Sequence, residues 1–111
     1  MNSEFSFTSK FDNGILVIKT EGYINSLGGE AIAKEFEKYF DNGLKNVLID
    51  LEKSKIINSI AITFFIEIIK KLIDKKGKLY FTNLDSTIEK TFSIMGLFQF
   101  AEKVNSVDEI K

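Results

Sequence analysis

Asn58 and Ser59 are two adjacent polar residues that stand alone between Ile56-Ile57 and the apolar run beginning at Ile60. They fall where a buried strand should pass into a helix. Capping that helix is one explanation, because both residue types are preferred at the N-cap. Presenting a hydroxyl for chemistry is the other. Backbone N–H groups and the helix dipole would favour a phosphate on a serine at a helix N-terminus.

Two other groupings invite a chemical interpretation. Gly28-Gly29 has neither the Walker spacing nor the dinucleotide fingerprint, so a flexible helix start or a close approach of two backbones is the better explanation. Asp50 and Glu52 form a carboxylate pair without a third acidic ligand nearby in the sequence. We expect both to be solvated loop residues, with Asp50 bonding backbone groups. No metal site and no cofactor are predicted.

The composition excludes several classes of function. The chain has no Cys and no His, which removes thiolate nucleophiles, imidazole bases and zinc clusters, so we do not expect an enzyme. The net charge is −1 and every basic residue is Lys, which argues against nucleic-acid binding. We also expect Phe64-Phe65 to be core rather than a stacking platform. The apolar run 60–69 is too short to span a bilayer and no signal peptide is evident, so a cytoplasmic protein without membrane insertion is expected.

Apolar periodicity sets out the elements. Residues 5–7 alternate and lead to an Asp12-Asn13-Gly14 turn, which predicts a hairpin with the strand at 15–18. Further strands are expected at 47–49, 79–81 and 100–104. Helices are expected from 26 to an Asn42-Gly43 stop, from 59 to 76, and from a capping box at Ser86-x-x-Glu89 to Gly96, with a frayed or helical tail from Ser106.

The order ββαβαβαβ predicts one α/β domain over residues 1–111, with helices packed on a mixed sheet. The second helix carries more apolar residues than the stripe of about 100° that packing on one sheet requires. Ile60 and Phe64 therefore either pack under another helix or meet a partner protein.

Three stretches stand in order along nearly the whole chain: ILVIKTEGYIN, NVLIDLEKSKIINSIAI and GKLYFTNLDSTIEKTFSIMGLFQF. The second resembles the strand, loop and D-S-[ST]-G helix start of the STAS domain family. The first is similar to the family's second strand and G-x-[IL]-[DN] turn, and the third to its next strand and helix. The free-standing bacterial members of this family are anti-sigma factor antagonists.

The resemblance implies a non-enzymatic switch. In the family, the residue that opens the second helix is phosphorylated by a partner that is both anti-sigma factor and serine kinase, and a PP2C-type phosphatase removes the phosphate. That residue is Ser59 here, and the unphosphorylated form would sequester the kinase. The resemblance also implies partner contacts at Asn25, which matches a polar residue of the earlier turn, and at Asn58, Ile60 and Ala61.

Three residues depart from the family motif. Asn58 replaces the usual aspartate, Ile60 a small residue and Ala61 a glycine. Losing the carboxylate lessens repulsion with a phosphate but removes a contact that a kinase could use, and Ile60 could hinder a kinase from closing over Ser59. The alternative hypothesis is therefore a STAS interaction module in a multiprotein signalling assembly that docks without being phosphorylated.

Overall fold

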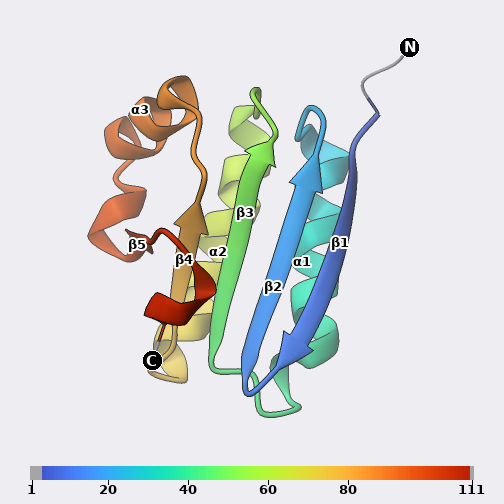
Figure 1. Cartoon of the computed structure of the whole chain (residues 1–111), viewed down its shortest axis with the longest axis vertical. Helices are drawn as coiled ribbons and strands as arrows, with labels where there is room; N and C mark the ends of the chain where they lie inside the picture. The colour runs from blue at the N-terminus through green and yellow to red at the C-terminus, as the bar shows by residue number, and fades with distance from the viewer. Residues whose placement is uncertain (1–3, 111) are drawn as a thin grey trace.

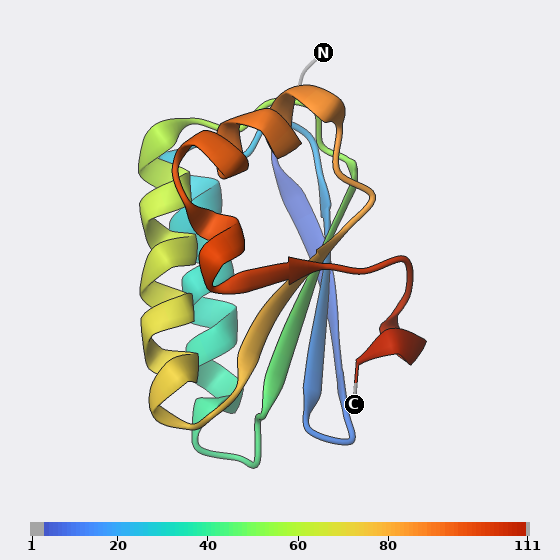
Figure 2. The same cartoon turned by 90° about the vertical axis from the view of Figure 1, so that its left-hand side faces the viewer.

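The computed structural model describes residues 4–110 as one mixed sheet with its long helices on one face (Figures 1 and 2). The strand order is β1-β2-β3-β4-β5. Strand β2 pairs antiparallel with β1 and parallel with β3, and β4 and β5 continue the parallel part. The strands are β1 (Ser6–Asp12), β2 (Ile15–Glu21), β3 (Asn46–Lys53), β4 (Lys78–Thr82) and β5 (Ala101–Lys103). The predicted α/β class and mixed sheet are confirmed.

Three α-helices connect the strands: α1 (Ser26–Phe40), α2 (Ser59–Asp74) and α3 (Ser86–Ile94). Helices α1 and α2 run side by side along one face of the sheet, and α3 lies beyond them at the side of the sheet that carries β4 and β5 (Figure 1). Two 3-10 turns complete the chain, η1 (Leu97–Gln99) and η2 (Val107–Glu109). Figure 2 shows that the segment with η2 crosses to the face of the sheet that α1 and α2 leave open.

The main core lies between the sheet and these helices. Strands β2 and β3 turn alternate apolar side chains toward the helices, as the period of two requires. Phe65 of α2, Phe81 of β4 and Phe92 of α3 meet there, with ring centroids 4.8 Å apart for the Phe81–Phe92 pair and 5.7 Å apart for Phe65–Phe81. Phe65 is therefore core, as predicted.

Local sequence explains the turns, with three corrections. Asn13 and Gly14 both have positive φ, as a two-residue hairpin turn requires. The second helix ends at Asp74 rather than 76, because Lys76 takes a left-handed conformation. Asp85 caps α3 by accepting from the Thr87 N–H, so the capping box predicted at Ser86 is wrong. The last strand is shorter than predicted, Ala101–Lys103.

One buried acidic side chain ties β1 to α1. The Ser9 hydroxyl donates to the Glu35 carboxylate, and this hydrogen bond lowers the pKa of Glu35 from its ordinary value. Lys38 lies 3.0 Å from the other carboxylate oxygen, and its own pKa is raised by that contact. Glu35 is thus a structural residue of the helix–sheet interface.

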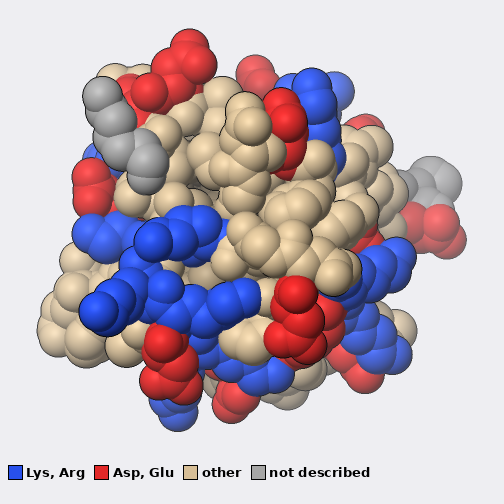
Figure 3. Space-filling view, turned by 90° about the horizontal axis from the view of Figure 1, so that it is seen from below, with Lys and Arg blue, Asp and Glu red and all other residues tan. Residues whose placement is uncertain are grey.

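Lysines gather at the end of the molecule where α1 and α2 finish (Figure 3). Lys38 lies in the last turn of α1 and Lys71 in the last turn of α2, where cations offset the negative end of the helix dipole. Lys75, just past α2, donates to the Phe40 carbonyl at the end of α1. The helices begin at the opposite end.

Candidate partner-binding site at the helix N-termini

Two asparagines cap the two long helices in the same way. The Asn25 side-chain oxygen accepts from the Gly28 N–H at 2.8 Å, and that of Asn58 accepts from the Ala61 N–H at 2.8 Å. Each bond satisfies one of the free N–H groups of a helix start. The cap of α2 therefore belongs to Asn58 and not to Ser59.

The loops before these helices are joined to each other. The Ile24 N–H donates to the Ile56 carbonyl at 3.0 Å, and the Asn58 N–H donates back to Ile24 at 3.0 Å. The Asn58 amide also donates to the Ser26 hydroxyl at 3.3 Å. Both helix starts are consequently held side by side at the carboxyl ends of β2 and β3.

Gly29 and Ala61 let α1 and α2 approach closely just below their starts. A Cβ added at Gly29 would lie 2.7 Å from the Ala61 Cα, so only glycine fits there. The second explanation for Gly28-Gly29, a close approach of two backbones, is therefore confirmed. Ala61 is fully buried in this contact. The structure gives Ala61 a packing role, and it does not belong to the surface that a partner could touch.

We expect Gly29→Ala to lower the free energy of unfolding by about 1–3 kcal/mol, because the added methyl forces the two helices apart. This outweighs the roughly 0.5–1 kcal/mol that alanine gains over glycine in a helix. Gly28→Ala is the matched control, since its Cβ would meet the Phe5 ring at 3.0 Å, a side chain that can turn, and the Asn25 side-chain oxygen at 3.4 Å, an ordinary van der Waals contact. Urea unfolding of both variants measures the two free energies of unfolding. Equal values for Gly29→Ala and Gly28→Ala would contradict the close contact between α1 and α2.

Ser59 occupies the first position of α2 with its side chain exposed. Within residues 4–110 its hydroxyl makes no hydrogen bond to another residue. The predicted placement at a strand-to-helix junction near the surface is confirmed. Because Asn58 supplies the cap, the Ser59 hydroxyl is not needed to cap α2.

Three exposed apolar side chains surround this helix start. Ile60 is 55% exposed, and Leu27 and Ile56 are 74% and 62% exposed. Leu27 lies in the first turn of α1 and Ile56 in the loop before α2, so all three flank the paired helix starts. We call Leu27, Ile56 and Ile60 the docking surface. Of the two alternatives for Ile60, packing under another helix is wrong, whereas Phe64 is partly buried beside Gly29.

The sequence reasoning did not find Leu27 or Ile56. A signal was present for Leu27, because Glu30 and Lys34, three and seven residues on along α1, share its side of the helix and are charged. Ile56 carried no such signal, since a loop has no periodicity. Only the hydrogen bonds between the two loops bring Ile56 beside α1.

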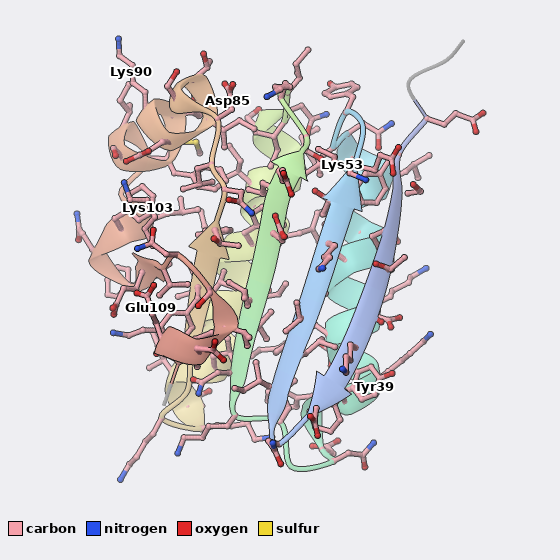
Figure 4. The ribbon with its side chains drawn as sticks, viewed as in Figure 1. Tyr39, Lys53, Asp85, Lys90, Lys103 and Glu109 are labelled. Carbon is pink, nitrogen blue, oxygen red and sulfur yellow. The ribbon has the colours of Figure 1, made fainter. Side chains whose placement is uncertain are left out.

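Basic residues border the docking surface on one side. Lys53 and Lys55 line a hollow of about 320 Å³ with Gly22, Tyr23 and Ile56. Figure 4 places Lys53 at the end of the sheet where α1 and α2 begin, and Asp85 at the same end over the β4 side. The docking surface therefore has lysines beside its apolar centre on one side, and polar groups around an apolar centre are usual in protein interfaces.

The carboxylate pair does not assemble a site. Both residues lie within β3, so the predicted loop placement is wrong. Asp50 accepts from the Glu52 N–H at 3.0 Å, which confirms the expected bond to a backbone group, and from the Asn83 amide at 3.0 Å. Among residues 4–110, no group of three acidic, His or Cys side chains is placed to hold a metal ion. Nor does any helix of that range have the length and apolar character to cross a membrane.

The sequence model of the STAS domain family matches residues 6–110 of the chain. The chain therefore belongs to the STAS domain family. This STAS domain is also 26% identical over 94 residues to the "Putative anti-sigma factor antagonist BtrV" of Bordetella bronchiseptica, covering 85% of this chain and 81% of that protein. The predicted family is confirmed.

Solved structures share the fold of this STAS domain at low sequence identity. An anti-sigma factor antagonist from Mycobacterium paratuberculosis superposes with a TM-score of 0.80 at 14% identity, covering 98% of this chain and 92% of that one. The phosphorylated form of the Bacillus cell fate determinant SpoIIAA superposes with a TM-score of 0.75 at 16% identity, covering 94% and 95%. These similarities establish the architecture.

Proposed function

We propose that this STAS domain is an anti-sigma factor antagonist controlled by phosphorylation of Ser59. While unphosphorylated, it sequesters a partner that is both anti-sigma factor and serine kinase, and so frees a sigma factor. A PP2C-type phosphatase would restore the binding form. The domain itself would act in the cytoplasm without catalysing a reaction.

One observation carries the proposal: an exposed serine with an unengaged hydroxyl opens α2 directly before Ile60 of the docking surface. The names of BtrV and of the structurally similar antagonists support the same class of function. The fold also suits the modification, because a related fold has been solved in a phosphorylated form.

The phosphoryl transfer would be simple for this domain. The Ser59 Oγ attacks the γ-phosphorus of ATP held by the kinase, the Oγ–P bond forms, and the bond to the ADP oxygen breaks. The hydroxyl proton leaves to a base on the kinase, since no carboxylate among residues 4–110 is hydrogen-bonded to the Ser59 hydroxyl. The product carries about 1.5–2 negative charges at a helix N-terminus, where they are tolerated.

The substitutions around Ser59 favour a second candidate. Ile60 places a bulky exposed side chain directly after the serine. The Asn58 side chain is already engaged, because its oxygen accepts from the Ala61 N–H and its amide donates to the Ser26 hydroxyl. A module that docks without phosphorylation would need only the apolar contacts of Leu27, Ile56 and Ile60. In that case Ser59 is an ordinary first residue of α2.

Mass spectrometry after incubation with the cognate kinase and ATP separates the two. We expect one phosphate on the parent chain, localised to Ser59, and none on Ser59→Ala. Circular dichroism of both chains controls for folding, because Asn58 still caps α2 in the variant. An unmodified parent chain that nevertheless binds the kinase would establish the docking module instead.

A further inference from the structure

The face of the sheet opposite α1 and α2 contains a hollow of about 500 Å³. It is lined by β-strand residues and closed on one side by the C-terminal segment at 105–107, which passes in front of the sheet (Figure 1). The strand register places four of the lining residues in one row across four strands: Thr8, Lys19, Asp50 and Thr82. The row is polar throughout, whereas the next row contains Val17 and Leu48, which give the hollow an apolar floor.

Thr82 supplies a buried polar atom without a partner. Its side chain is 5% exposed, and its Oγ1 finds no hydrogen-bond partner in the part of the chain that the structure describes. Leu79 and Phe81 of the same strand belong to the helix-side core, so by alternation Thr82 lies on the face that carries the hollow. Buried hydroxyls are nearly always hydrogen-bonded, and an unpaired one costs roughly 1–3 kcal/mol. The atom itself has almost no solvent-accessible surface, so a ligand in the hollow would pair it once the Thr82 side chain turns toward the ligand.

Two lysines on this face lack ion-pair partners. Lys10 and Lys19 both line the hollow, and neither is within 4.0 Å of a carboxylate oxygen in residues 4–110. Lys10 lies opposite Val17 and Lys19 opposite Thr8, so the two lysines are diagonal neighbours on adjacent strands. Side chains so placed come within reach of one another, and both ammonium groups can meet a single anion. Asp50 adds an acceptor beside them.

We propose that this hollow binds a small organic anion that also carries a hydrogen-bond donor. The anionic group, carboxylate or phosphate, lies between Lys10 and Lys19, and its apolar body rests on Val17 and Leu48. The donor, an amino or hydroxyl group, reaches Thr82 Oγ1 or the Asp50 carboxylate. The volume is within the range of about 300–1,000 Å³ that small-molecule sites occupy.

The geometry favours a small molecule over a polymer. The hollow is bounded by the C-terminal segment, and the lysines number two without an arginine, too few for a nucleic-acid track. The site also lies across the sheet from the packed α1 and α2 and shares no lining residue with the docking surface. The two sites therefore do not overlap.

Amide NMR shifts of the uniformly labelled full chain test the proposal with two probes. 4-Aminobenzoate presents a carboxylate and adenosine monophosphate a phosphate, each with an apolar ring and an amino donor. We expect at least one to bind with a dissociation constant of about 1 mM or tighter and to shift amides at Lys19, Asp50 and Thr82. Inorganic phosphate is the control. Equal shifts with phosphate alone, or none with either organic probe, overturn the proposal.

Two variants make the assignment specific. Thr82→Val keeps the shape but removes the hydroxyl, so we expect affinity for the bound probe to fall about threefold to tenfold while the melting temperature is kept or raised. The double variant Lys10→Gln with Lys19→Gln should lose tenfold or more. Lys34→Gln, an exposed lysine on α1, is the matched control and should bind like the parent. Unchanged affinity in both site variants would place the probe elsewhere and reject the site.

Discussion

Ser59→Asp should bind the cognate kinase about ten- to a thousandfold more weakly than the parent chain, at roughly 1.4 kcal/mol for each factor of ten. The aspartate introduces part of the negative charge that a phosphoserine would carry, directly before Ile60 of the docking surface. If the kinase presents a carboxylate at this point, it repels the new aspartate by about 1 kcal/mol at 4 Å in water and by about 4 kcal/mol at an effective dielectric of 20. An apolar partner surface would add the cost of removing water from the carboxylate.

The same substitution should leave the fold intact. Ser59 is exposed, and its hydroxyl makes no hydrogen bond to another residue within 4–110. An acidic side chain at the first position of a helix is also favourable. Ser59→Ala is the matched control and should bind like the parent, because it adds no charge. Calorimetric titration of the three chains against the kinase gives the affinities directly. If Ser59→Asp and Ser59→Ala bind equally well, charge at this position does not control docking and the switch is rejected.

Ile60→Asp should abolish most of the kinase binding without unfolding the domain. Full burial of an isoleucine contributes roughly 1.5–3 kcal/mol, and about half of that remains for the exposed part of Ile60, so we expect a loss of about four- to tenfold before the further cost of the buried carboxylate. The melting temperature should stay close to that of the parent. Ile60 is already 55% exposed in the isolated domain, and an aspartate in the first turn suits the helix dipole.

Ile73→Asp is the control for Ile60→Asp. Ile73 has a similar exposure, 50%, and belongs to the same helix, but it lies near the other end of α2. Its replacement changes the same residue type and charge away from the docking surface, so kinase binding should be retained. Pull-down and thermal melting of both variants separate the outcomes. A collapsed fold in Ile60→Asp alone would mean that Ile60 is needed for packing, and equal loss of binding in both would mean that the docking surface lies elsewhere.

Much of the fold could be predicted from local patterns. The Asn13-Gly14 turn specified the hairpin, because both residues tolerate positive φ. Apolar alternation predicted the first strand, short apolar runs predicted the buried strands, and helical spacing predicted α1 and α2. The helix ends were less accurate, since Asp85 and Ser86 are both good caps and only the backbone conformation selects one of them.

The candidate site was only half visible in the sequence. Asn58 and Ser59 could be located because an isolated polar pair between apolar runs needs an explanation. The sequence could not decide which of them caps the helix, because one residue supplies the cap and either type suits it. The structure assigns the cap to Asn58 and leaves the Ser59 hydroxyl unengaged.

The remaining features depended on contacts between segments distant in sequence. Ala61 matched a family motif position, but its burial follows from Gly29, more than thirty residues earlier in the chain. Ile56 joins Leu27 at the docking surface through hydrogen bonds between two loops. Thr82 comes to share a row with Lys19 only through the register of three strands. Sequence periodicity reports which face of its own element a residue occupies, whereas the neighbours on that face are decided by how the elements pack.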